Sequence, residues 1–177
     1  MSNGVDARRC APYLRPPVSD LSLKTERPED AAEANALIER VFGPGRLTKV
    51  SERVREHATF APELSFCAWR AGRLEGVVRQ WRVRVGETPV VFLGPIAVDP
   101  GARSAGVGGQ LVAAACEAAK AAGEAAIVLV GDEPYFERFG FSAAAARDVR
   151  LPGPVDPRRV LAAVFGDAVL SGMVHGA

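Results

Sequence analysis

The sequence has few of the residues from which metal sites and disulfide frameworks are built. Its 177 residues include three cysteines and two histidines. An odd number of widely spaced cysteines does not fit a disulfide framework, and the close Cys or His pairs of a zinc site are absent. Cys67, in an apolar run, and Cys116, in an alanine-rich run, are therefore predicted to be buried side chains. We expect no resident metal.

Net charge and long apolar runs are also nearly missing. The formal net charge is +1, so no global field draws the protein toward nucleic acid or anionic lipid. No apolar run approaches the roughly 20 residues of a membrane span, and residues 1–9 lack the apolar core of a signal peptide. We expect no nucleic-acid or membrane partner and a cytoplasmic location. An anionic ligand would therefore have to be bound by a local group of positively charged or N–H-donating residues.

The length predicts one domain with a substantial core. Residues 1–20 combine prolines and arginines without apolar periodicity, which predicts a flexible leader before a single domain at 21–177. Strands are expected at 21–25, 64–69, 74–85, 90–98 and 125–130. Helices are expected from 28 and at 49–59, 108–122 and 134–139, with a helical turn over 158–165 and an apolar stretch at 168–174.

This element order predicts a mixed α/β fold. The three strands between 64 and 98 are joined by tight turns and should form an antiparallel meander. The following strand–helix–strand unit should be a right-handed parallel crossover. In the strand at 74–85, the side chains of Val77, Arg79 and Trp81 should face one way, opposite to Val78 and Gln80. The helix at 49–59 is expected to carry its charges on its outer faces: Glu52, Arg53, Arg55 and Glu56.

Gly94 and Pro95 are unusual in the middle of a strand, because proline cannot donate to a ladder. A bulge or a splay from the neighbouring strand would accommodate Pro95. The backbone groups of Ile96, Ala97 and Val98 would then be free to bind an extended, amide-bearing ligand. The alternative is an edge strand or a simple kink.

A glycine-rich segment immediately precedes the helix at 108–122. Backbone N–H groups at a helix start, together with the helix dipole, form an anion site, and an arginine there adds a forked donor. The candidate residues are Arg103, Ser104, Ala105, Gly106, Val107, Gly108 and Gly109. The alternative is a glycine-rich turn that binds no ligand.

Two other nucleotide motifs fit less well. A P-loop needs Gly-Lys-Ser/Thr after four spacer residues, and this segment has no lysine. A dinucleotide fingerprint would have its third glycine at Leu111 and would begin directly after the strand. Asp132 lies at a tolerable distance for a ribose contact, so this interpretation is weakened and stays open.

At these motifs the chain resembles the GNAT acetyltransferases, in particular their YhbS-like bacterial branch. The matching features are Ile96-Ala97-Val98, the Arg-x-x-Gly-x-Gly segment from Arg103 to Gly108, and the short helix that ends in Gly140-Phe141. The resemblance covers roughly residues 21–141 in element order and extends more loosely into the tail.

The resemblance implies the GNAT fold, with a V-shaped split between the strands at 90–98 and 125–130. Acetyl-CoA, the implied co-substrate, would enter that split, and an amine acceptor would approach from the opposite side. The backbone of Ile96–Val98 would hold the pantetheine arm, and Arg103–Gly109 would wrap the pyrophosphate. The segment from Tyr135 to Phe139, with Phe136 and Phe139 as the contact residues, would lie near the thioester and the arm. The implied activity is N-acetylation of a small molecule or a protein amino group, and a homodimer is plausible.

The chain differs from many family members at the position of the residue that protonates the leaving thiolate. Many members have a tyrosine four residues before the glycine of Gly-Phe, and here that residue is Phe136. Tyr135 is adjacent, but one step along a helix turns a side chain by about 100°. Tyr135 can be the catalytic acid only if the helix is rotated or begins irregularly. Otherwise Tyr135 is a partly buried aromatic residue, and the thiolate leaves unaided.

No general base is evident from the sequence. Four carboxylates flank the strands and are expected to be solvated: Glu63, Glu75, Glu87 and Asp99. His57 and His175 are expected at the surface, so a water chain could remove the proton instead. Arg79, Arg82 and Arg84 could favour an acidic acceptor or simply cover a solvated strand face.

The principal alternative to an acetyltransferase is an acyl-CoA-binding or sensing domain without turnover, because Phe136 has no proton to give. A nucleotide-dependent oxidoreductase is a more distant alternative. The sequence indicates neither the acceptor nor the acyl chain length.

Overall fold

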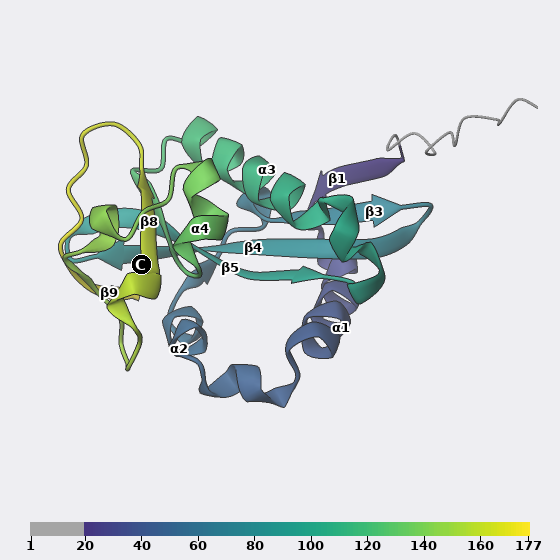
Figure 1. The fold of residues 1–177 in the computed structure, drawn as a ribbon, viewed down its shortest axis with the longest axis horizontal. Coiled ribbons are helices and arrows are strands. Elements are labelled where there is room, and N and C mark those ends of the chain that lie inside the picture. Colours follow the sequence, from purple (N-terminus) through teal and green to yellow (C-terminus); the bar gives the residue numbers. More distant parts are fainter. Residues whose placement is uncertain (1–19) are drawn as a thin grey trace, which may run out of the picture.

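The computed structural model describes residues 20–177, so the predicted leader, apart from Asp20, lies outside the described residues, as does Cys10. A nine-stranded mixed sheet forms the centre of the molecule, with helices on both faces (Figure 1). The main strand order is β1-β3-β4-β5-β6-β8. The predicted mixed α/β architecture is confirmed.

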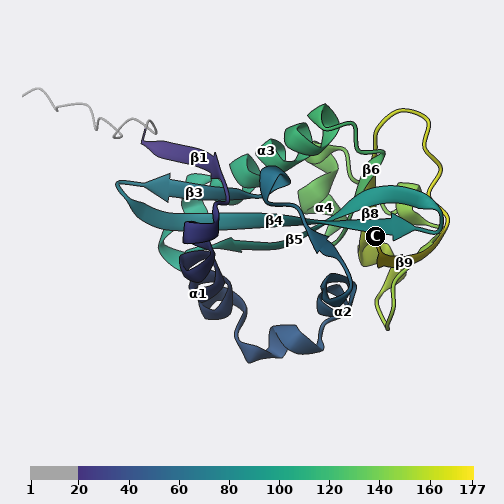
Figure 2. The same cartoon turned by 180° about the vertical axis from the view of Figure 1, so that it is seen from behind.

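The N-terminal part combines one edge strand with two helices. Strand β1 is Leu21–Thr25, and a 3-10 turn at Pro28–Asp30 leads into α1, Ala31–Phe42. Gly43, with a φ of 63°, ends α1, and α2 follows at Val50–Glu56. Both helices lie against the same face of the sheet, which is clearest from behind (Figure 2).

The predicted antiparallel meander consists of β3 (Phe66–Arg70), β4 (Arg73–Val85) and β5 (Thr88–Val98). The short strand β2, Thr59–Phe60, also pairs with β4. The expected alternation along β4 is confirmed, since Val77 packs with α1 on one face and Val78 with α3 on the other. Gln80 lies on the same face as Val78, and its side-chain amide donates a hydrogen bond to the Ala115 carbonyl of α3.

The crossover that follows is parallel, as predicted. Helix α3 is Val107–Ala121, and β6, Ala126–Val130, pairs in parallel with β5. Helix α4 is a single turn, Glu133–Phe136, continued by a 3-10 turn at Glu137–Phe139. Helices α3 and α4 cover the face of the sheet opposite to α1 and α2 (Figures 1 and 2).

The tail corrects one prediction. Residues 158–165 were expected to form a helical turn, but only Pro157–Arg159 is helical, and Val160–Val164 is strand β8. Strand β8 pairs antiparallel with β6 and buries side chains on both faces of the sheet. In a short apolar run that is buried on both faces, the spacing of the apolar residues does not distinguish a strand from a helix. The pairing with β6 therefore determined that this segment is a strand. Strands β7 (Val149–Arg150) and β9 (Gly172–Gly176) complete the sheet.

The cysteines inside the described range are packing residues. Cys67 is fully buried and packs between the sheet and α1, while Cys116, a residue of α3, is partly buried against the core. Burial raises the pKa of both thiols to about 12. Both side chains are therefore protonated at neutral pH, and neither is a candidate nucleophile.

Strands β5 and β6 separate soon after they meet. Only two residue pairs join them, Val91 with Ile127 and Phe92 with Val128. Beyond these pairs the strands diverge, which confirms the predicted split in the sheet. Between residues 93 and 98, the edge of β5 that faces β6 has no strand partner among the described residues.

No helix within residues 20–177 has the length and apolar character needed to cross a bilayer. In the same part of the chain, no group of three or more His, Cys, Asp or Glu side chains is placed to hold a metal ion.

Candidate active site

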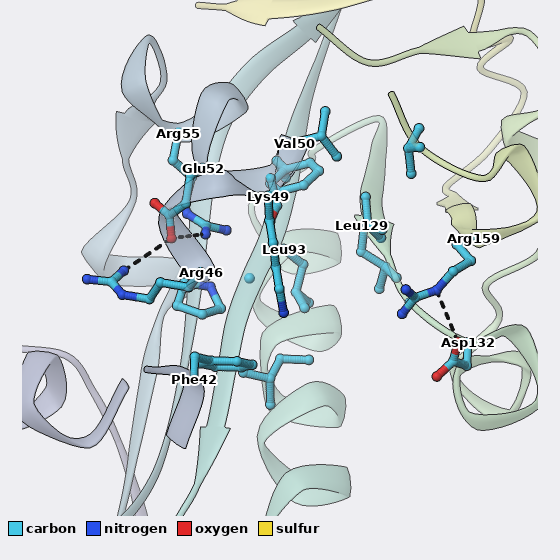
Figure 3. Close-up of a pocket in the computed structure, with 18 of the residues that line it drawn as sticks. Phe42, Arg46, Lys49, Val50, Glu52, Arg55, Leu93, Leu129, Asp132 and Arg159 are labelled. Carbon is cyan, nitrogen blue, oxygen red and sulfur yellow. Dashed lines mark hydrogen bonds and ion pairs between the residues drawn. The ribbon is translucent and has the colours of Figure 1, made fainter. Parts of the chain in front are cut away.

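A cavity of about 660 Å³ lies at the split between β5 and β6. Its lining comes from both faces of the sheet: the segment that joins α1 to α2 on one side, and the starts of α3 and α4 on the other. Figure 3 shows the wall formed by Arg46, Glu52 and Arg55, and the facing wall with Asp132 and Arg159. The split therefore connects the α1–α2 face of the protein with the α3–α4 face.

A bulge in β5 forms the floor of this cavity. Gly94 and Pro95 together stand opposite the single residue Arg79 of β4, so the register shifts by one. This is the bulge predicted from Pro95. Beyond it, Ile96 and Val98 line the cavity, whereas the Ala97 side chain points into the core beside α1. Ala97 can therefore contribute only backbone groups to the site.

The bulge is held by a side chain of the neighbouring strand. The indole Nε1 of Trp81 donates a hydrogen bond of 2.8 Å to the carbonyl oxygen of Gly94. The Trp81 ring packs on Phe60, with 5.0 Å between the ring centroids. Trp81 thus fixes the position of the β5 backbone at the point where the edge of the strand becomes free.

Replacing Trp81 by phenylalanine should destabilise the protein by about 1–2 kcal/mol, because the Gly94 carbonyl loses its donor. The acetyl-CoA affinity should fall as well, since the bulge is no longer fixed. The measurements are the denaturant midpoint at unchanged slope and the Kd for acetyl-CoA. Trp69→Phe is the matched control, because the described residues offer the Trp69 indole no hydrogen bond. Equal effects of the two changes would contradict this role of Trp81.

The glycine-rich turn predicted to bind an anion lies at the start of α3. Asp99 caps the 3-10 turn Pro100–Ala105 by accepting a 2.9 Å hydrogen bond from the Gly101 N–H. That bond, reinforced by Arg73 and Arg40, holds the pKa of Asp99 below its usual range. The carboxylate therefore stays charged and keeps the turn in place at neutral pH.

The residues of this turn have different surroundings. Gly106 is the N-cap of α3 with a φ of 72°, a conformation that favours glycine. Gly108 lines the cavity, whereas the Val107 side chain is buried in the core. Arg103 and Ala105 are exposed. The structure thus brings part of the predicted set to the cavity, and Val107 can contribute only its backbone.

Tyr135 and Phe136 both line the cavity, but they contact different parts of its wall. A Cβ atom added at Gly108 would lie 3.2 Å from the Tyr135 hydroxyl oxygen, so this hydroxyl reaches the start of α3 inside the cavity. The Phe136 side chain is buried and packs directly on Gly131, where an added Cβ would collide with the ring. Helix α4 is a single α-helical turn that passes into a 3-10 turn after Phe136.

An arginine that sequence reasoning missed lies beside this tyrosine. The Arg138 guanidinium stacks on Tyr135 at 4.5 Å and on Phe139 at 4.8 Å from the ring centroids. Its Nη2 is 3.4 Å from a Cβ position built at Gly109, in the first turn of α3. Within residues 20–177 Arg138 has no carboxylate partner. The only sign in the sequence that Arg138 belongs to the site was its place in the segment from Tyr135 to Phe139.

The wall formed by α2 corrects a second prediction. Glu52 and Arg55 were expected on the outer faces of their helix, but both line the cavity, together with Arg46 and Lys49. Of the charges predicted to be external on this helix, Arg53 and Glu56 are exposed. The apolar side of α2, formed by Val50 and Val54, rests on the sheet and turns Glu52 and Arg55 toward the split.

The carboxylates considered as bases from the sequence lie elsewhere. Glu63 pairs with Arg82, and Glu75 with Arg70, while Glu87 is fully exposed. These residues, Asp99, His57 and His175 are not part of the cavity lining. Three carboxylates do line it, and each is bound by arginine: Glu52, Asp132 and Asp156.

The three arginines of β4 that were considered as acceptor contacts do not line the cavity either. Arg79 forms a bidentate pair with the buried Glu26 and donates to Asn35. Arg82 is bound by Glu63 and Glu124, and Arg84 lies near Glu87. Their suggested contact with an acidic acceptor is not supported by this geometry.

Comparisons with known proteins agree with this architecture. A model of the acetyltransferase (GNAT) family matches residues 32–141, which is more than half of the chain. The uncharacterized N-acetyltransferase YhbS of Escherichia coli K12 is 29% identical over 142 residues, which cover 75% of this chain and 80% of that protein.

Solved structures show the same relationship. The crystal structure of Escherichia coli YhbS in complex with CoA superposes with a TM-score of 0.72 at 28% identity, covering 88% of each chain. A GNAT acetyltransferase from Brucella melitensis in complex with acetyl-CoA gives a TM-score of 0.66 at 27% identity, covering 88% of this chain and 94% of that one. The family match, the split sheet and the glycine-rich turn before α3 lead to one assignment: the chain belongs to the acetyltransferase (GNAT) family.

Proposed function

We propose that this protein transfers the acetyl group of acetyl-CoA directly to an amine. The observation that carries the proposal is the cavity at the β5–β6 split. It joins the free edge of β5 and the start of α3 on one face to a polar wall on the other. Such a passage gives a donor and an acceptor access to one point from opposite sides. The relatives that contain CoA and acetyl-CoA support the choice of donor.

The residues present fit the donor. The free N–H and C=O groups of Ile96–Val98 can pair with the amide groups of a pantetheine arm as a neighbouring strand would. The N–H groups from Arg103 to Gly109, at the positive end of α3, suit a pyrophosphate. Arg138 adds a guanidinium at the same helix start, so we include it in the proposed diphosphate site.

Tyr135 is the proposed acid. The acceptor nitrogen forms a bond to the acetyl carbon, and the carbon–sulfur bond breaks. The Tyr135 hydroxyl gives its proton to the leaving sulfur, and the amine loses its extra proton to water. Phe136 and Phe139 hold the Tyr135 ring through edge and tilted contacts, with centroid distances of 4.9 Å and 6.1 Å. Their proposed role is to position the phenol and to exclude water.

The test combines binding with turnover. Calorimetric titration should show that acetyl-CoA binds to the folded protein, and free thiol should then appear only when an amine is present. Acetyl-CoA binding without thiol release for any amine would favour the acyl-CoA-sensing alternative. No binding by the folded protein would contradict both functions.

A further inference from the structure

The cavity wall on the α1–α2 side carries more positive than negative charge. Three cations of this wall line the cavity, Arg46, Lys49 and Arg55, against one carboxylate, Glu52. On the facing wall Asp132 is paired with Arg159 at 3.1 Å, and Asp156 is paired with Arg158 at 2.8 Å. The excess charge therefore belongs to the side from which the acceptor would approach (Figure 3).

One carboxylate oxygen on this wall accepts hydrogen bonds from two guanidinium groups. Oε1 of Glu52 accepts from Nη1 of Arg46 at 3.1 Å and from Nη2 of Arg55 at 2.6 Å. The group of three side chains thus keeps one net positive charge. Lys49 adds another: its Nζ lies 5.4 Å from the centroid of the Phe42 ring, and it has no ion pair within the described part of the chain.

Arg55 is the cation of this wall that lies beside the β5 bulge. Its side chain is only 9% exposed, and Nη1 lies 3.6 Å from a Cβ position built at Gly94, next to the β5 bulge. Nη1 has no hydrogen-bond acceptor among the described residues. Burial lowers the pKa of Arg55, and the Glu52 carboxylate only partly offsets that effect. A buried guanidinium with a free donor beside a cavity is suited to an anionic group of a ligand.

We infer that the acceptor is a small amine that carries its own anionic group, a carboxylate or a phosphate, bound by Arg55 together with Arg46 and Lys49. The inference rests on the proposed acetyl transfer and names the substrate class of the same site. Polyamines and lysine-rich protein segments are disfavoured, because a second positive charge would be repelled by this wall.

The same charges help to explain how a site without an evident base can use an amine. Cations close to the bound ammonium lower its pKa and so increase the fraction of neutral, nucleophilic amine. The released proton passes to water. Recognition of the acceptor anion and deprotonation of its amine would then depend on the same three side chains.

The experiment compares matched amines in the presence of acetyl-CoA, with thiol release as the readout. The pairs are β-alanine with propylamine, O-phosphoethanolamine with ethanolamine, and each standard amino acid with its amide. Spermidine represents cationic acceptors. In at least one pair the anionic member should react with a kcat/KM about 100-fold higher. The responding pair shows whether the anion is a carboxylate or a phosphate.

Variants connect that preference to the wall. Arg55→Gln should reduce it to below about tenfold and weaken calorimetric binding of the anionic amine to the CoA complex, while acetyl-CoA binding is unchanged. Lys49→Gln, at an exposed position, should act in the same direction if Arg55→Gln does not fold. Arg53→Gln is the matched control, because Arg53 is exposed on the same helix and does not line the cavity.

Preferred turnover of the uncharged members or of spermidine would overturn the inference and leave acetyl transfer standing. A preference unchanged in both Arg55→Gln and Lys49→Gln would overturn it too, as would failure of every anionic amine to bind or react. Failure of the wild type to bind acetyl-CoA would be a different result, which removes the proposed function and this inference together.

Discussion

Replacement of Tyr135 by phenylalanine is expected to lower kcat for acetyl transfer about 100-fold, within the usual range for loss of a general acid. The Kd for acetyl-CoA should remain within about twofold of the wild-type value, because the ring and its stacking contacts are kept. The reason is geometric: the hydroxyl reaches the cavity at the start of α3, and Phe136 is buried on Gly131. Steady-state kinetics and calorimetry test the two expectations.

A purely structural role for Tyr135 predicts a different pattern. The hydroxyl would then contribute to stability or to acetyl-CoA binding, and its loss would appear in Tm or Kd with kcat unchanged. Phe136→Leu is the matched comparison, because it alters the packing beneath Tyr135 without removing the proposed proton donor. It should reduce stability by about 1 kcal/mol and reduce kcat much less than Tyr135→Phe.

Replacement of Gly108 by valine is expected to weaken acetyl-CoA binding at least about 100-fold, the equivalent of two lost hydrogen bonds to a charged group. A Cβ atom at this position would lie 3.2 Å from the Tyr135 hydroxyl and 3.5 Å from Cγ2 of Val98. A branched side chain would therefore fill the place where the start of α3 meets β5. Calorimetric titration of acetyl-CoA measures the loss.

Ala113→Val controls for the introduction of a β-branched residue into the same helix. Ala113 is exposed on α3 and does not line the cavity. Both variants should keep the helical signal in circular dichroism, since valine costs less than about 1 kcal/mol in a helix interior. If Gly108→Val bound acetyl-CoA as tightly as Ala113→Val, the proposed diphosphate site at the start of α3 would be wrong.

The bulge in β5 was predictable because its cause is local, whereas the split in the sheet was implied by the family resemblance. Proline has no N–H to donate, so Pro95 could not continue a regular ladder on both sides of β5. The bulge opposite Arg79 agrees with that property, whereas the pairing of β5 with β6 already ends at Phe92. The hydrogen bond from Trp81 that fixes the bulge was not predictable, because periodicity does not show what an indole N–H contacts.

Two of the predictions that the structure corrects have a common origin. Strand β8 was expected to be helical, and Glu52 and Arg55 were expected to face outward. In both cases the sequence pattern is compatible with more than one orientation or element type. Pairing with β6 settled the first, and docking of Val50 and Val54 on the sheet settled the second. Neither contact is encoded within a few residues of the segment concerned.

The sequence by itself determined the antiparallel meander, the parallel crossover, the glycine turn before α3 and the break at Pro95. These features depend on backbone conformations and side-chain periods that extend over only a few residues. The tertiary structure alone decided that the Tyr135 hydroxyl reaches the start of α3, that the Phe136 ring packs on Gly131, and that Arg46, Lys49 and Arg55 share one wall. Each of these outcomes depends on how a short helix rests on its neighbours, and a rotation of about 100° would exchange adjacent side chains.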